Sequence, residues 1–146
     1  MDRRPKIYFA CAISAGRRDA PIYRHIVRQL RCYGTVLTEE FVRPAFTGDA
    51  GLTPSEVNGR DLDWLLVSDL LVAEITVPSL GVGYEISKAE SWGKPVLCLY
   101  RLGHGLASPM ITGAKGVFSA PYGAGEQIQT ILACYFALRR ITPGEG

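Results

Sequence analysis

The sequence predicts an α/β fold in which a central, mostly parallel five-stranded sheet lies between two layers of helices. Short apolar runs alternate with amphipathic stretches along the chain. The apolar runs are nearly continuous, which is typical of parallel strands buried on both faces. The length of 146 residues and a hydrophobic content of 47% fit one domain spanning residues 1–146.

The first half of the chain supplies two strands and one helix. Residues 7–13 form an apolar strand, and Gly16 follows in a loop. Residues 21–33 form a helix after a potential cap at Asp19, with an apolar stripe at helical spacing. Residues 35–38 form a short strand. The next stretch, 39–58, is rich in proline and glycine and has few apolar anchors, which predicts an irregular segment that can act as a flap.

The second half continues the same alternation. We expect, in order, a helix at 59–69, a strand at 70–77, a helix at 82–92, a strand at 96–100, a glycine-containing loop at 101–107, a short helix at 109–113, a small strand at 117–118, a helix at 126–140 and a loose tail at 142–146. This order predicts a three-layer, Rossmann- or flavodoxin-like fold. Such sheets bind ligands at the carboxyl ends of their strands, so the site is expected to follow residues 13, 77 and 100.

Composition excludes several classes of function. The formal net charge is +2, from 16 basic and 14 acidic residues, which is too balanced for a protein that binds nucleic acid or a membrane surface. No apolar run reaches the roughly 18 residues of a membrane helix. We interpret residues 7–13 as a core strand rather than as part of a signal peptide, because the residues after them fit a loop and helix of the fold.

The metal-ligating residue types are sparse. The four cysteines are scattered without a C-x-x-C pair, which predicts reduced thiols and a cytoplasmic protein, with nuclear entry open to a chain this small. With only His25 and His104 present, a multi-histidine metal site is excluded. The sequence therefore predicts no metal ion.

The segment Pro-Ser-Leu-Gly-Val-Gly-Tyr-Glu at 78–85 joins a buried strand to a helix. Gly81 and Gly83 let backbone amides approach a ligand, Ser79 adds a hydroxyl, and a helix start favours anions such as phosphate. The spacing differs from the dinucleotide motif, because Ile86 stands where its third glycine would be. The pattern indicates an anion-binding turn.

Several acidic residues are candidates for chemistry. Glu85 falls in the first turn of the predicted helix, beside its apolar face, where it either faces the crevice or is a surface residue suited to a helix start. Cleavage of a glycosidic bond needs a second ionisable group. Asp61 and Asp63 flank the apolar stripe of their helix at nearly equal angles, so periodicity leaves both open. Glu74, inside an apolar strand, is a further candidate.

These residues resemble the 2′-deoxynucleoside 5′-phosphate N-hydrolase (Rcl) family of the nucleoside 2-deoxyribosyltransferase superfamily. The resemblance extends from about residue 6 to residue 136. Its motifs are Tyr8-Phe9, Ile13, Gly16-Arg17, the string YGTVLTE at 33–39, Asp61-Leu62 with Trp64-Leu65, and the string AEITVPSLGVGYE at 73–85. It implies hydrolysis of the N-glycosidic bond of deoxynucleoside monophosphates, including 5-hydroxymethyl-dUMP as a candidate, to free base and 2-deoxyribose 5-phosphate.

The resemblance also implies roles for individual residues. Glu85 is implied as the nucleophile at C1′, Asp61 as the partner acid/base, and Tyr8 as the residue that positions sugar and nucleophile. The implied substrate-binding residues are Cys11, Ile13, Ser14, Gly16, Arg17, Ser79, Gly81, Ser108 and Met110. Members of the family form homodimers, so Ser108 is expected to reach the phosphate bound by the neighbouring subunit. No metal or organic cofactor is implied.

Some positions depart from the family's pattern. Ala12 and Ser14 stand where relatives have a serine and an arginine, which removes a hydroxyl and a charge near the nucleotide. Glu40 stands where relatives can have histidine, and the loop before Ser108 is one residue shorter. Two alternatives remain: a deoxyribosyltransferase, which uses the same Glu85 chemistry to pass the sugar to another base, and a sensor, which uses the same anion-binding turn to bind nucleotide without consuming it.

Overall fold

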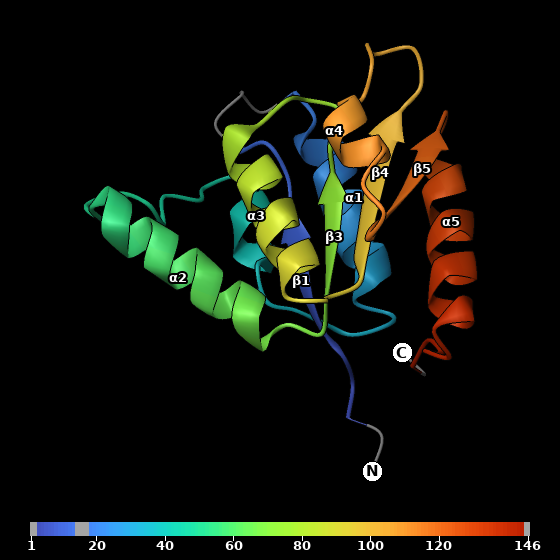
Figure 1. The fold of residues 1–146 in the computed structure, drawn as a ribbon, viewed down its shortest axis with the longest axis horizontal. Coiled ribbons are helices and arrows are strands. Elements are labelled where there is room, and N and C mark those ends of the chain that lie inside the picture. The colour runs from blue at the N-terminus through green and yellow to red at the C-terminus, as the bar shows by residue number, and fades with distance from the viewer. Residues whose placement is uncertain (1–2, 14–17, 145–146) are drawn as a thin grey trace.

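The computed structural model describes residues 3–13 and 18–144 and confirms the predicted α/β fold (Figure 1). Its sheet has the strand order β2-β1-β3-β4-β5, and every neighbouring pair runs parallel. The strands are β1 (Lys6–Ala10), β2 (Thr35–Val36), β3 (Leu70–Glu74), β4 (Val96–Arg101) and β5 (Val117–Tyr122). This is the flavodoxin-like order, whose switch point lies between β1 and β3.

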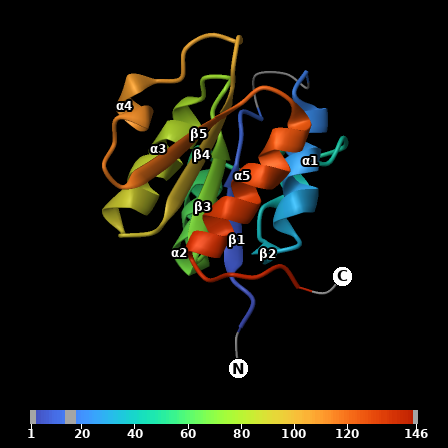
Figure 2. The same cartoon turned by 90° about the vertical axis from the view of Figure 1, so that its right-hand side faces the viewer.

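The helices alternate with the strands as predicted. They are α1 (Ala20–Leu30), the 3-10 helix η1 (Glu39–Val42), α2 (Pro54–Val67), α3 (Leu80–Ser91), α4 (Pro109–Thr112) and α5 (Gly125–Leu138). Figure 2 shows the sheet nearly edge-on, with α3 on one side and α1 and α5 on the other. Within the described residues, no helix is both long and apolar enough to cross a membrane.

Alternating side chains of the strands point to opposite faces of the sheet and belong to two separate hydrophobic cores. On one face Ile7 and Phe9 of β1 pack with α1 and α5. On the other face Tyr8 and Ala10 pack with α2 and α3, and Leu65 of α2 is fully buried there. Because successive strand residues point to opposite faces, β1 contributes to both cores and is covered on both sides.

Several predicted boundaries are wrong. The irregular stretch ends at residue 53 rather than 58, because α2 begins at Pro54. Thr53 and Glu56 form a capping box there, with Thr53 Oγ1 accepting from the Glu56 amide at 3.2 Å and Glu56 Oε2 accepting from the Thr53 amide at 2.7 Å. That T-x-x-E signal, with proline at the first helical position, is visible in the sequence and could have placed this start.

Strand ends also differ from the prediction. β1 ends at residue 10 rather than 13, and β3 ends at 74 rather than 77, where the Glu74 carboxylate accepts from the Thr76 amide at 2.6 Å. β5 is longer than predicted and contains Pro121, which is tolerated because β5 is an edge strand. Of the predicted tail 142–146, Gly144 donates its amide to the Cys32 carbonyl at 2.8 Å, and residues 145–146 lie outside the described residues.

Candidate active site

Glu85 and Tyr8 meet at the switch point of the sheet. Glu85 lies near the start of α3, where Ser79 caps the helix by accepting from the Val82 amide at 3.3 Å. Tyr8 comes from β1, with its ring fully buried. Its hydroxyl donates a hydrogen bond of 2.7 Å to Glu85 Oε1. Glu85 is therefore not a plain surface residue, because it is half-buried, lines a cleft and is bound by a buried tyrosine.

Burial controls the protonation of this pair. The pKa of Glu85 is raised from 4.5 to about 7. Burial contributes most of this rise, the Tyr8 hydrogen bond opposes it, and the charge of Asp61 adds to it. The pKa of Tyr8 is raised, first by burial and then by Glu85, so the phenol stays protonated as a donor. A carboxylate with a pKa near neutrality is a group that can change its charge state during a reaction.

The structure separates the two aspartates that periodicity left open. Asp61 is mostly buried, its side chain 20% exposed, and lines the same cleft as Glu85. Asp63 is exposed. Asp61 Oδ1 accepts from Arg60 Nε at 2.8 Å. Burial raises the pKa of Asp61, and the hydrogen bond and charge of Arg60 oppose that rise.

We define the carboxylate cleft as the hollow of about 470 Å³ between α2, α3 and the segment before α2. Gly81 also lines it, and a Cβ placed on Gly81 would have only Ser79 Oγ, at 3.8 Å, within 4 Å. The site at the start of α3 is therefore open to a ligand. Its lining residues are Asp49, Leu52, Pro54, Val57, Asn58, Asp61, Leu62, Gly81, Tyr84 and Glu85.

Ser79 and Ser108 lie together in a second hollow. This serine groove, of about 520 Å³, runs between the start of α3 and the segment before α4. Leu80 and Leu106, which also line it, are 97% and 100% exposed. Met110 is 83% exposed and is not among the residues that line the serine groove or the carboxylate cleft.

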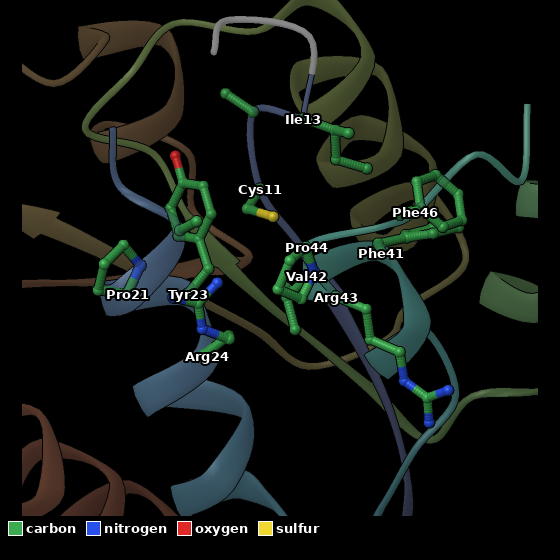
Figure 3. Close-up of a pocket in the computed structure, with 12 residues that line it drawn as sticks. Cys11, Ile13, Pro21, Tyr23, Arg24, Phe41, Val42, Arg43, Pro44 and Phe46 are labelled. Atoms are coloured by element: carbon green, nitrogen blue, oxygen red, sulfur yellow. The ribbon is translucent and has the colours of Figure 1, made fainter. Parts of the chain in front are cut away.

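Cys11 and Ile13 lie in a third hollow, the loop cleft, of about 310 Å³ (Figure 3). It separates the end of β1 from η1 and the start of α1, and the rings of Tyr23, Phe41 and Phe46 line it. Burial raises the pKa of the Cys11 thiol to about 12, so it is a neutral packing group. The predicted site residues Ser14, Gly16 and Arg17 lie outside the described residues.

Sequence reasoning missed two polar groups at this edge of the sheet. Arg60 binds Asp61, and no spacing signal in the sequence points to that contact. On the other side of the sheet, Arg101 Nη2 donates to Asp19 Oδ1 at 2.9 Å, and both side chains are largely buried. Glu74, a candidate from the sequence, is fully buried beside this pair and lines none of the three hollows. The described residues contain no cluster of three or more potential metal-ligating side chains.

Comparison with known proteins decides the family. No protein-family model matches the chain. A 5-hydroxymethyl-dUMP N-hydrolase from Mus musculus is 42% identical over 142 residues, which cover 89% of this chain and 79% of the mouse protein. The protein of the same name from Danio rerio is 41% identical over 135 residues, covering 89% and 94%.

The chain belongs to the deoxynucleoside 5′-phosphate N-hydrolase family. The resemblance inferred from the strings at 33–39 and 73–85 is thereby confirmed, and with it the class of enzyme, an N-glycosyl hydrolase. Among solved structures, a 2-deoxyribosyltransferase from Bacillus psychrosaccharolyticus matches with a TM-score of 0.65 and 21% identity, covering 96% of this chain and 99% of the transferase. That likeness shows that this N-hydrolase family member shares the fold of the transferase.

Proposed function

We propose that the chain hydrolyses the N-glycosidic bond of 2′-deoxynucleoside 5′-monophosphates, with 5-hydroxymethyl-dUMP as the first candidate substrate. The observation that carries the proposal is the pairing of Glu85 with Tyr8 in a cleft that also contains Asp61. A sugar without a 2′-hydroxyl loses its base more readily, because it lacks the electron-withdrawing hydroxyl next to the developing cation at C1′. A nearby carboxylate stabilises that cation and can trap it.

In this mechanism Glu85 is the nucleophile. Its carboxylate attacks C1′, the bond from C1′ to the base nitrogen breaks, and the base leaves with the electron pair and a proton donated by Asp61. Asp61 then takes a proton from water, whose oxygen attacks C1′ and releases Glu85 and 2-deoxyribose 5-phosphate. Tyr8 holds Glu85 Oε1 through its 2.7 Å hydrogen bond and orients the other oxygen for attack. The chemistry uses side chains of the protein and no cofactor.

The phosphate is proposed to lie at the start of α3. Backbone amides at a helix N-terminus favour an anion, and Ser79 adds a hydroxyl beside Gly81. The first loop, with Cys11, Ile13, Ser14, Gly16 and Arg17, is proposed to enclose the nucleotide, and Met110 to lie near the base. Two serine hydroxyls near the phosphate, Ser79 from one subunit and Ser108 from its partner, favour a phosphorylated substrate and therefore the hydrolase over the transferase.

The test is base release measured by chromatography. Purified protein is incubated with deoxynucleoside monophosphates, including 5-hydroxymethyl-dUMP, beside the matching ribonucleotides and unphosphorylated nucleosides. We expect free base from the deoxy monophosphates only, and none with Glu85→Gln. A second base added to the assay gives a new nucleoside if the chain is a transferase. Nucleotide binding without base release, unchanged in Glu85→Gln, indicates a sensor and contradicts the proposal.

We also propose that the active form is a homodimer in which Ser108 completes the partner's phosphate site. Leu80 and Leu106 expose almost their whole side chains beside the serine groove, and burial against a second copy would remove this apolar surface from water. Mixing two inactive variants tests the arrangement. Equal amounts of Glu85→Gln and Ser108→Ala subunits should restore about a quarter of the wild-type sites if Ser108 acts across a two-fold interface. No restoration after verified subunit exchange contradicts it.

A further inference from the structure

Arg60 connects Asp61 to the segment that precedes α2. Its Nε donates to Asp61 Oδ1 at 2.8 Å, its Nη2 to Asp49 Oδ1 at 2.7 Å, and its Nη1 to the Gly48 carbonyl at 3.1 Å. One guanidinium therefore joins the candidate acid/base to Asp49, which lines the same carboxylate cleft. This contact is not an ordinary helix-surface ion pair, since adjacent residues on a helix do not face each other.

Two aromatic rings fix the guanidinium in place. The Arg60 Cζ atom lies 5.3 Å from the ring centroid of Phe41 and 5.3 Å from that of Trp64. Phe41 belongs to η1, and Trp64 lies one turn further along α2. The Arg60 side chain is 21% exposed. A planar cation held against two ring faces loses little freedom when it binds a carboxylate, and a lysine cannot reproduce this geometry.

The geometry of the carboxylate fits a positioning role. Asp61 accepts the Arg60 hydrogen bond through Oδ1, whereas its Oδ2 accepts no hydrogen bond from the described residues. Because Arg60 also binds the Gly48 carbonyl and Asp49, the same side chain fixes the part of the cleft wall that Asp49 forms.

We propose that Arg60 is a positioning residue for the reaction, which holds Asp61 by one oxygen, leaves the other for substrate, and fixes the Gly48–Asp49 wall of the cleft. The inference rests on the proposed function, in which Asp61 is the acid/base. It predicts that Arg60 affects both the chemical step and the protonation of Asp61.

The charged groups around Asp61 determine whether the loss of Arg60 raises or lowers the pKa of Asp61. Arg60 lies against it, Asp49 lies on the far side of Arg60, and Glu85, bound by Tyr8, lines the opposite wall of the cleft. Burial raises the pKa of Asp61, Arg60 lowers it and Asp49 raises it. Removing the cation at Arg60 must therefore raise the pKa of Asp61 further.

The experiment compares Arg60→Gln and Arg60→Lys with the wild type. The Asp61 carboxyl is titrated by ¹³C NMR, with its signal assigned by its loss in Asp61→Asn, and kcat and KM are measured against pH with 5-hydroxymethyl-dUMP. Arg31→Gln is the matched control, since Arg31 forms an exposed ion pair of 2.8 Å with Glu39 away from the carboxylate cleft. Thermal unfolding of each variant reports on folding separately.

In Arg60→Gln we expect the Asp61 titration to move up by about 0.5 to 1 pH unit, since the pair is partly exposed. The limb of the kcat profile set by Asp61 should move with it, and kcat should fall about tenfold. Arg60→Lys keeps the charge but loses the fork, so it should titrate nearly as the wild type and still lose kcat. Asp49→Asn weakens the wall contact and also removes a charge that raises the pKa of Asp61, so it should raise KM more than it lowers kcat and move the Asp61 titration down.

Two results would overturn the inference. One is an Asp61 titration that Arg60→Gln leaves unmoved. The other is a variant with reduced thermal stability but wild-type kcat and pH profile, which would make Arg60 a purely structural ion pair. A wild-type chain that releases no base from any nucleotide overturns the proposed function instead, and it does so before any variant is compared.

Discussion

Glu85 and Glu74 are carboxylates at the same edge of the sheet that lie on opposite sides of it, Glu85 half-buried and Glu74 fully buried. Burial raises the pKa of both. Glu85 opens onto the carboxylate cleft and accepts a phenol hydrogen bond. Glu74 is 0% exposed, accepts from the Thr76 amide, and is packed beside the Arg101–Asp19 ion pair. A raised pKa therefore does not identify a reactive group by itself, and access to a cleft makes the difference.

Exchanging each glutamate for glutamine tests this contrast most strongly. We expect Glu85→Gln to lower kcat by more than about 10³-fold, because the proposed nucleophile is lost. Glu74→Gln should change kcat by less than about threefold, since its amide oxygen can still accept from Thr76. Base release at saturating nucleotide measures both. Equal losses in the two variants would remove the distinction between the two sides of the sheet.

The ion pair beside Glu74 should contribute to stability rather than to chemistry. Asp19→Ala leaves Arg101 with a buried charge, and we expect the free energy of unfolding to fall by about 2 to 4 kcal/mol. Glu39→Ala breaks the exposed pair with Arg31 and should cost less than about 1 kcal/mol. Urea unfolding of both variants gives the comparison. If Asp19→Ala lowered the free energy of unfolding as little as Glu39→Ala does, burial would not make the Arg101–Asp19 pair more important for stability than the exposed pair.

Glu85 should make stability depend on pH in a defined window. Its pKa is about 7 in the folded protein against an ordinary value of 4.5, so the folded state binds this proton more tightly. The stabilisation from Glu85 is complete below pH 4.5 and is lost as the pH rises through 7. Glutamine does not titrate, so Glu85→Gln should gain roughly 1 to 2 kcal/mol relative to the wild type between pH 4 and pH 8. Urea unfolding at both pH values checks this, and a parallel pH dependence in the two proteins would contradict the raised pKa.

The smallest effect concerns the neighbours of Glu85. Tyr8→Phe removes a hydrogen bond that lowers the pKa of Glu85, so the acidic limb of kcat should move up by about half a pH unit and kcat should fall about tenfold. Asp61→Asn removes a charge that raises that pKa, so the residual activity should show the limb at lower pH. The test is whether the acidic limb of the kcat profile moves up in Tyr8→Phe and down in Asp61→Asn. A shared direction would mean that solvent access, rather than these contacts, determines the pKa.

The sequence determined the fold class and the family, because both depend on local patterns. Continuous apolar strands alternating with amphipathic helices require a parallel sheet covered on both faces, and the string at 73–85 placed Glu85 at a helix start. The helix start at Pro54 was also encoded locally, in the Thr53–Glu56 capping box, although the proline and glycine content of the preceding segment favoured an irregular structure.

Only the tertiary structure decided which charged groups meet. Helical periodicity left Asp61 and Asp63 equivalent, and packing of α2 against α3 turned Asp61 toward the cleft and left Asp63 exposed. The contacts of Tyr8 with Glu85, Arg101 with Asp19, and Arg60 with both Asp49 and Phe41 join residues from separate elements. Propensity and periodicity describe neighbours along one helix or strand, whereas the charge state and orientation of a buried group depend on what the fold packs against it.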